Sequence, residues 1–183
     1  MALADYRTGF SDYQQGRLAA LHILSAPVVA KYDVDISLED RQKLEDLLTK
    51  TSKQQFASAV LFGRSDTDKA NILSRLSRQL QLCVCWVDCQ YLLSHYIGET
   101  EKHLARLVAD AQTNQWILFF AEADALFARQ SEPKDSHENH TDPHLKQVLD
   151  RILGYNGLSI FSLQQQPTLD RVRSRLSCVI HCH

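Results

Sequence analysis

The sequence predicts an α/β fold in which helices cover both faces of a parallel sheet. From residue 57 onwards, short apolar runs alternate with stretches of helical periodicity, an alternation typical of parallel sheets. The chain has 183 residues, of which 44% are hydrophobic, enough for one domain with a sizeable core. It contains only 6 glycines, which disfavours a site built from a glycine-rich loop.

A first helix is predicted over residues 11–25. Ser11 is a suitable N-cap, and Pro27 would end the helix. Its apolar residues at turn spacing are Leu18, Leu21 and Leu24.

A second helix is predicted from Leu38 to Lys50. Ser37 opens it, and Asp40 follows three residues later. Its apolar stripe consists of Leu44, Leu47 and Leu48. We interpret residues 1–55 as a short N-terminal helical extension and residues 56–183 as the core domain.

The core domain is expected to hold seven apolar or periodic stretches. They are Ala57–Phe62, Ile72–Leu82, Val84–Val87, Leu104–Ala111, Trp116–Phe120, Leu145–Leu153 and Leu158–Leu163. The polar segment Arg129–Asp142 interrupts them and is interpreted as a surface loop.

Charge and hydropathy exclude several classes of partner. The 20 Lys and Arg against 22 Asp and Glu give a net charge of −2, so no basic surplus favours nucleic acid. No apolar run approaches a membrane span, and the N-terminus lacks a leader's apolar region. We therefore expect a cytoplasmic protein, whose five cysteines are reduced thiols.

Two groups of residues have metal-ligand types but are interpreted without a metal. In the tail, strand alternation would separate the cysteines from the histidines, which favours an edge strand. The histidines of the polar segment and its end are interpreted as solvated. The residues concerned are Cys178, His181, Cys182 and His183 in the tail, His137 and His140 in the segment, and His144 just after it.

The stretch after Phe62 occupies the place of a phosphate-binding loop, between a strand and a helix. Its residues are the candidate nucleotide-binding residues Gly63, Arg64, Ser65, Asp66, Thr67, Asp68, Lys69 and Ala70. A working loop, GxxxxGK[ST], turns backbone N–H groups onto phosphate and places a hydroxyl on Mg²⁺. Only Gly63 and Lys69 match, because Asp68 replaces the second glycine and Ala70 lacks the hydroxyl.

Four further blocks accompany this loop in order along the chain. They read SHYIGETEKHL from Ser94, ILFFAEADALF from Ile117, SEPKDSH from Ser131 and YNGLSIFSLQQQPTLD from Tyr155. From Phe62 to about Cys182 the chain resembles the AAA family of ATPases, in particular the bacterial type with SKYIGETEKNL and ILFFDEADALF. The resemblance implies a three-layer P-loop NTPase core with strand order 5-1-4-3-2. It also implies that the C-terminal lid domain of the family is absent, since the chain ends near the last core strand.

The resemblance also assigns residues to the catalytic positions of the family. Ala121 stands where the Walker B aspartate holds Mg²⁺, and Glu122 matches the general base. Gln164 corresponds to the sensor asparagine, and Arg175 to one of the paired arginines. We interpret Glu122, Gln164 and Arg175 as vestigial or structural candidates, since a general base has little to act on without a metal-polarised phosphoryl group.

The best-preserved block matches the first pore loop of the family. There Tyr96, Ile97 and Gly98 would line the channel of a hexameric ring and grip extended polypeptide. A second interpretation stays open, in which Tyr96 and Ile97 only pack beside the helix that starts near Glu101.

The substitutions in the two Walker motifs predict loss of ATP hydrolysis. Ala70 and Ala121 both remove contacts to one Mg²⁺ ion, which would bridge the β- and γ-phosphates. Asp66 and Asp68 add negative charge where a triphosphate would lie. We expect no Mg²⁺, and at most weak binding of ATP or ADP.

Three functions remain open at this point. The first is an AAA-like pseudo-ATPase that serves as an interaction or regulatory subunit, either in a bacterial contractile or secretion-type assembly or beside an active AAA ATPase, to which it would lend Arg175 or whose ring growth it would block. The second is a weak ATP-binding AAA ATPase that remodels a protein through Tyr96. In the third, the carboxylates near Lys69 hold a cation or a basic peptide. The sequence does not identify the partner or the oligomeric state.

Overall fold

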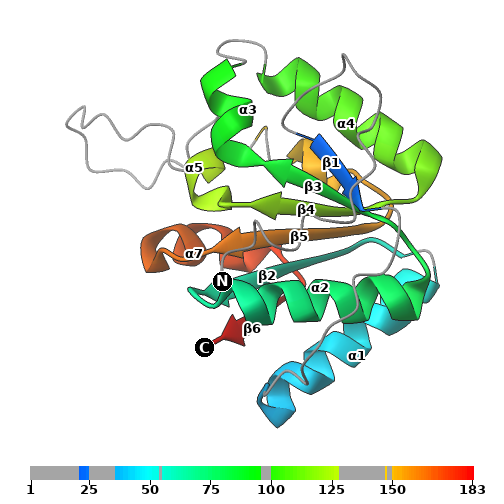
Figure 1. The fold of residues 1–183 in the computed structure, drawn as a ribbon, viewed down its shortest axis with the longest axis vertical. Helices are drawn as coiled ribbons and strands as arrows, with labels where there is room; N and C mark the ends of the chain where they lie inside the picture. The colour runs from blue at the N-terminus through cyan, green and yellow to red at the C-terminus, as the bar shows by residue number, and fades with distance from the viewer. Residues whose placement is uncertain (1–20, 25–35, 54, 96–99, 128–146, 148–149) are drawn as a thin grey trace.

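The fold was analysed in a computed structural model of the chain, which describes residues 21–24, 36–53, 55–95, 100–127, 147 and 150–183. These residues form three layers, with a six-stranded sheet in the middle (Figure 1). The strands are β1 (Leu21–Leu24), β2 (Ala57–Gly63), β3 (Val84–Asp88), β4 (Ile117–Ala121), β5 (Leu158–Leu163) and β6 (Cys178–Cys182).

The strand order is β1-β3-β4-β5-β2-β6. Counted without β1, the five parallel strands have the predicted order 5-1-4-3-2, which is confirmed. Residues 57–61, 84–87, 117–121 and 158–163 are all buried, because parallel strands are covered on both faces.

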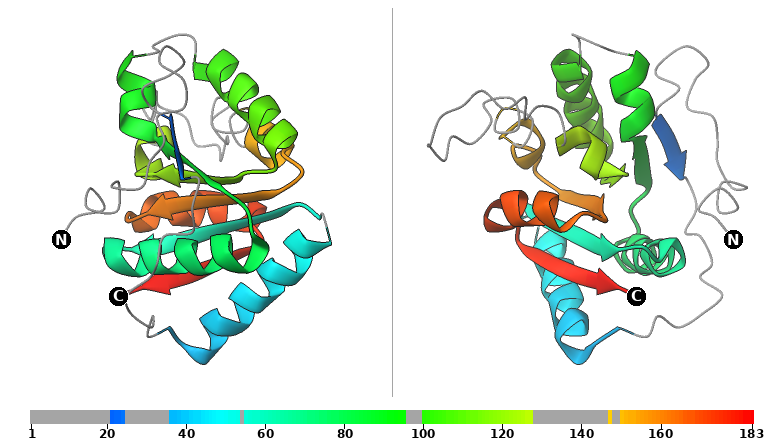
Figure 2. Two further views of the ribbon diagram at one scale, coloured as in Figure 1. Left: turned by 45° about the vertical axis from the view of Figure 1, so that its right-hand side comes forward. Right: turned by 90° about the vertical axis from the view of Figure 1, so that its left-hand side faces the viewer.

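Helices cover both faces of the sheet, as predicted (Figure 2). They are α1 (Leu38–Ser52), α2 (Asp66–Leu80), α3 (Cys89–His95), α4 (Thr100–Asn114), α5 (Ala123–Phe127) and α7 (Gln166–Val172). Core residues of α1 and α2 pack on one face, and those of the other four helices pack on the opposite face.

Helix α1 confirms the prediction for residues 38–50. The Ser37 side chain accepts a hydrogen bond from the Asp40 backbone N–H at 3.0 Å, which caps the helix. Leu44, Leu47 and Leu48 are buried as expected. The helix lies against β6 and β2, while the proposed domain division at residue 55 stays a prediction.

The predicted helix over residues 11–25 is wrong at its C-terminal end, where Leu21–Leu24 form β1. This strand pairs antiparallel with β3, with Leu21 opposite Val87 and Leu24 opposite Val84. A sheet edge offers unpaired backbone groups, and here pairing with that edge overrides the leucine spacing. Ser11, Leu18 and Pro27 lie outside the described residues.

No helix in the described part of the chain is long and apolar enough to cross a bilayer.

Candidate functional site

Three strands that are neighbours in the sheet end at the candidate site. The order β4-β5-β2 brings Glu122, Gln164 and Gly63 to the carboxyl ends of these strands. Ligand sites of open α/β sheets lie at this edge. The fold therefore brings together the loop, base and sensor positions that the sequence predicts.

The predicted loop is shorter than expected, because α2 begins at Asp66. Arg64 and Ser65 alone connect β2 to this helix, so the prediction of a loop through Asp66–Ala70 is wrong. The Ser65 side chain accepts a hydrogen bond from the Asp68 backbone N–H at 3.3 Å and thereby caps the helix. With no glycine after Gly63, these residues continue the helix instead of forming an open phosphate cradle.

Gly63 is required by the close approach of β6. It pairs with Cys182 and has a φ of 138°, a backbone conformation that favours glycine. A Cβ atom at this position would lie 1.9 Å from the Cys182 carbonyl oxygen. The packing of β6 therefore explains why position 63 is a glycine, independently of any phosphate.

Lys69 is fully buried in the first turns of α2, with 0% of its surface exposed. Its Nζ has no hydrogen-bond partner among the described residues. Burial lowers the pKa of Lys69, and Asp66, Cys182, Asp124 and Glu122 oppose this shift electrostatically. The Lys69 ammonium is therefore close enough to Asp124 and Glu122, just after β4, to interact with them electrostatically.

The residues of this edge do not fit a Mg²⁺ ion. Ala70 is buried in α2, and Ala121 is the last residue of β4. An alanine side chain has no oxygen, whereas Mg²⁺ in nucleotide sites is held by hydroxyl and carboxylate oxygens. Both positions that the resemblance assigns to this ion therefore lack a ligand.

Glu122 is exposed and has a φ of 51°. Its left-handed backbone makes a sharp turn between β4 and α5. No hydrogen bond holds its side chain among the described residues, and the interpretation of Glu122 as a vestigial candidate stays a prediction.

Asp124 has a structural role that the sequence reasoning missed. Its carboxylate accepts hydrogen bonds from the backbone N–H groups of Gln164 at 2.7 Å and Gln165 at 3.2 Å. These bonds fasten the end of β5 to α5 and place Gln164 beside the end of β4. Asp124 comes three residues after a buried strand, and this position could have suggested a structural role at the strand ends.

Arg175 lies in a 3₁₀ turn, η2 (Arg173–Arg175), and is bound within the chain. Its guanidinium donates to the Asp150 carboxylate and forms an ion pair with it. The sequence did not indicate this partner. Arg175 is therefore not presented as a free arginine for a neighbouring subunit.

Other predicted residues lie outside the described part of the chain. These are Tyr96, Ile97 and Gly98 of the pore loop and His137, His140 and His144 of the polar segment and its end.

The side chains of the tail strand alternate between two environments. Ile180 and Cys182 pack in the α1 and α2 layer with Cys178 beside them. His181 and His183 are exposed and stack on each other. The alternation predicted for this strand is thus confirmed.

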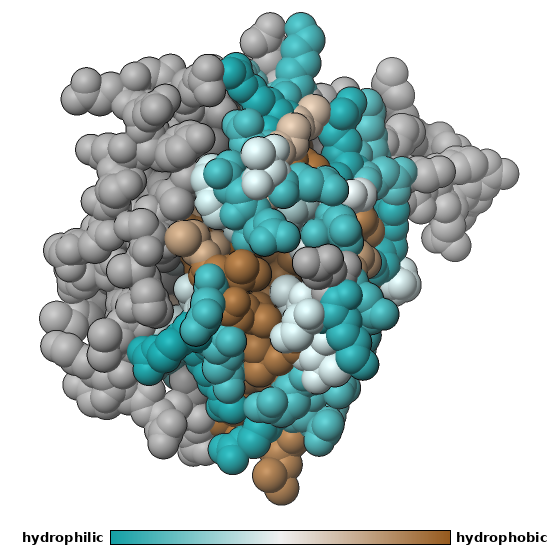
Figure 3. Space-filling model, turned by 90° about the vertical axis from the view of Figure 1, so that its right-hand side faces the viewer, coloured by the Kyte–Doolittle hydropathy of each residue, from teal (hydrophilic) through white to brown (hydrophobic). Residues whose placement is uncertain are grey.

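A hollow of about 520 Å³ lies at the opposite edge of the sheet, where the strands begin. Figure 3 shows hydrophobic atoms at the centre of this face with hydrophilic residues around them. Its apolar side chains include Leu80, Leu82 and Trp116, and its polar ones include Gln79 and Gln112. No Asp, Glu, Lys, Arg or His lines it, so it offers none of the chemistry of the candidate site.

Comparison with known families matches residues 59–176 to the family described as ATPase family associated with various cellular activities (AAA). A curated relative is the ATPase family gene 2 protein of Schizosaccharomyces pombe. It is 25% identical over 109 residues, which are 59% of this chain and 14% of the relative.

Two solved structures of the FIGL-1 AAA domain share the fold, and one of them is a complex with ADP. Both superpose with a TM-score of 0.61, at 19% and 17% identity. Each match covers 87% of this chain and 57% of the FIGL-1 chain. The chain thus spans less than two thirds of each of these relatives.

Proposed function

The chain belongs to the AAA family of ATPases, and we propose that within this family it is a pseudo-ATPase that acts through contacts with other proteins. The observation that carries the proposal is the start of α2 at Asp66, which replaces the phosphate-binding loop by a helical turn. The two alanines at the metal positions support the same proposal.

The electrostatics of the helix start oppose a triphosphate. Helix N-termini attract anions through their free N–H groups, but Asp66 and Asp68 already occupy the first turn of α2. Two unit charges of like sign about 5 Å apart repel by about 3 kcal/mol at an effective dielectric near 20. Lys69 cannot offset two such repulsions without a divalent cation.

The remaining catalytic candidates do not restore hydrolysis in this proposal. Glu122 would have to activate water against a phosphoryl group that no metal polarises, and such a base accelerates little. Gln164 has an amide, as the sensor residue of the family does, but without a positioned phosphate it has nothing to orient. Arg175 is paired with Asp150.

The proposed partner is a protein, either an active AAA ATPase beside which the chain docks or a bacterial contractile or secretion-type assembly. Docking beside an active subunit would block ring growth in this proposal, and the site that this chain contributes would not hydrolyse ATP. In this proposal the chain does not contact nucleic acid or a membrane, and it is located in the cytoplasm. Tyr96 of the pore-loop block is the residue through which an active relative would grip a substrate.

A thermal-shift series tests nucleotide binding by the purified chain. A ligand that binds the native state raises the unfolding midpoint. We expect no shift with ATP or ADP at concentrations up to about 1 mM, with or without Mg²⁺, because binding weaker than this contributes little stability. A shift that requires Mg²⁺ would contradict the proposal.

One observation favours a second candidate, a weak ATP-binding AAA ATPase that remodels a protein partner. The buried Nζ of Lys69 has no partner among the described residues, and a phosphate could supply one. This candidate requires detectable Mg-ATP affinity. Calorimetry that detects no heat of binding at millimolar nucleotide would exclude it.

A further inference from the structure

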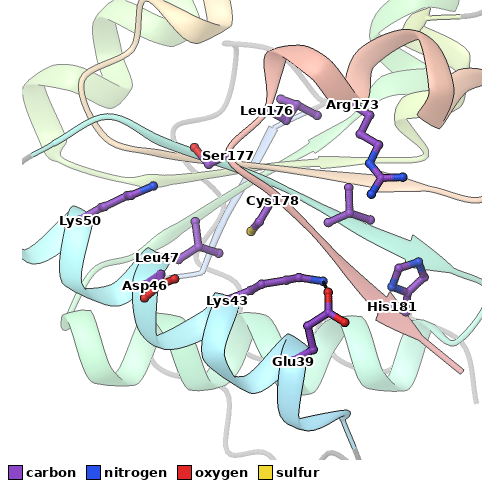
Figure 4. A pocket seen from close by; sticks show the side chains of 11 residues that line it. Glu39, Lys43, Asp46, Leu47, Lys50, Arg173, Leu176, Ser177, Cys178 and His181 are labelled. Carbon is purple, nitrogen blue, oxygen red and sulfur yellow. Dashed lines mark ion pairs between the residues drawn. The ribbon is translucent and has the colours of Figure 1, made fainter.

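A hollow of about 400 Å³ lies between α1 and the edge of β6 that does not pair with β2. We call it the edge groove and define it by Lys43, Leu47, Lys50, Arg173, Cys178 and Val179, which line it. Figure 4 shows side chains from α1, β6 and the turn before β6 around the same space. The groove is separate from the nucleotide position, because Asp66–Ala70, Glu122 and Gln164 do not line it.

The backbone of β6 faces this groove. β6 is the last strand of the described sheet, and its other side pairs with β2. The backbone N–H of His181 donates to the Asp40 carboxylate at 3.4 Å, so it points away from β2. Backbone groups alternate sides along a strand, and the N–H and C=O of Val179 therefore point outward too. Because α1 already binds the His181 N–H, the Val179 groups are those that another extended chain can pair with.

The floor of the groove is apolar. Leu47 and Val179 are buried, and Cys178 beside Val179 in β6 is half-buried. Burial raises the pKa of the Cys178 thiol to about 11, so the thiol is neutral near neutral pH. The floor therefore suits an apolar side chain of a bound segment.

The rim of the groove carries charges of both signs, and two of its cations have no partner among the described residues. Lys43, Lys50 and Arg173 line it, against the carboxylates of Glu39 and Asp46. Lys43 is held by Glu39 at 2.7 Å and Asp40 at 3.0 Å, whereas Lys50 and Arg173 form no ion pair with any described residue. Lys50 and Arg173 are therefore available to the carboxylates of an acidic partner.

We propose that the edge groove binds an extended, acidic segment of a partner protein as an added strand beside β6. Its backbone pairs with Val179, an apolar side chain contacts Leu47, and carboxylates contact Lys50 and Arg173. The inference rests on the proposed interaction role and gives that role a surface.

The test uses a fluorescein-labelled peptide of about seven residues with a central valine and two glutamates on each side of it, so that an added strand carries carboxylates on both of its faces. We expect saturable binding by fluorescence anisotropy that weakens as salt is raised. The double variant Lys50→Glu with Arg173→Glu should weaken binding at least about tenfold. The matched control is Lys53→Glu with Arg171→Glu, two exposed cations outside the groove, and it should bind like the unsubstituted chain.

Two altered peptides test the mode of binding. A peptide with lysine in place of glutamate should not bind, and one with N-methyl groups on alternate residues should lose binding although its charge is unchanged. Equal binding by the N-methylated peptide would overturn strand addition. Equal effects of the two double variants, or no saturable binding at all, would contradict the assignment of the edge groove as the binding surface. Neither result bears on ATP hydrolysis, so a failure here is distinguishable from a failure of the pseudo-ATPase proposal.

Discussion

Lys69 is a buried cation that no described residue neutralises by direct contact. Its ammonium lacks a hydrogen-bond partner there, and burial of an unpaired polar group costs free energy. Burial lowers its pKa, although Asp66, Cys182, Asp124 and Glu122 favour the charged form. A residue that a working site would use to bind phosphate is therefore expected to destabilise the fold here.

We predict that Lys69→Met stabilises the chain by about 1–3 kcal/mol at neutral pH, because the variant keeps the volume and removes the buried charge. Since the folded pKa lies below 10.5, the unfolded state binds more protons between the two values. The stability of the unsubstituted chain then rises relative to that of the variant as pH approaches 10.5. The stabilisation gained by Lys69→Met therefore becomes smaller over this range. Urea unfolding over this range measures the difference.

The control for this prediction is Lys53→Met at an exposed lysine, which should change stability by less than about 0.5 kcal/mol. A loss of stability in Lys69→Met, with Lys53→Met neutral, would mean that the ammonium has a favourable partner.

At the scale of the elements, α1, α2, α4 and the strands β2–β6 could be predicted, α3, α5 and α7 were not predicted, and two local structures were predicted wrongly. Ser37 with its apolar stripe identified α1, and the continuous apolar runs identified the parallel strands. The start of α2 was misplaced, because the loop was inferred from the place of a P-loop. Ser65 as cap and Asp66 in the first turn favour helix instead.

Strand β1 shows why local spacing was not sufficient. Leu21 and Leu24 fit a helical turn, but Leu21–Leu24 find their partner in β3, far away in the sequence. The role of Asp124 and the Arg175–Asp150 pair also depend on contacts across 40 and 25 positions. Such contacts follow from the tertiary fold, so a single sequence does not indicate them.

The pairing of β2 with β6 leads to a prediction at Gly63. Gly63→Ala should destabilise the chain by at least about 2 kcal/mol, because the new Cβ would meet the Cys182 carbonyl and the φ is unfavourable for alanine. Gly154→Ala is the control, since its Cβ would meet only backbone atoms at 3.3 Å and beyond. Chemical unfolding of both variants measures the difference. Equal stability of the two would show that β6 does not lie as close to Gly63 as described.

At the scale of the whole molecule, two apolar layers bury several thiols. Burial raises the pKa values of Cys85 and Cys182 to about 12 and holds that of Cys89 well above its usual 9.0. The folded state therefore keeps these thiols protonated at pH values where the unfolded chain ionises them. Their contribution to stability is complete below pH 9 and is lost as pH rises toward the folded values.

We predict that the unfolding midpoint falls steadily above about pH 9, where each such thiol removes up to about 1.4 kcal/mol per pH unit. Lys69 acts in the opposite direction but is a single group. Thermal unfolding between about pH 8 and about pH 10.5 measures the slope. Cys85→Ala should have a shallower slope because one ionisable thiol is removed. A midpoint that does not change over this range would contradict the burial of these groups.

The most direct measurement of the central claim is phosphate release from Mg-ATP by the purified chain, with Lys69→Met as the matched variant. The helical start of α2 and the alanines at positions 70 and 121 predict the same background rate for both proteins. Saturable turnover by the unsubstituted chain that disappears in Lys69→Met would contradict the account.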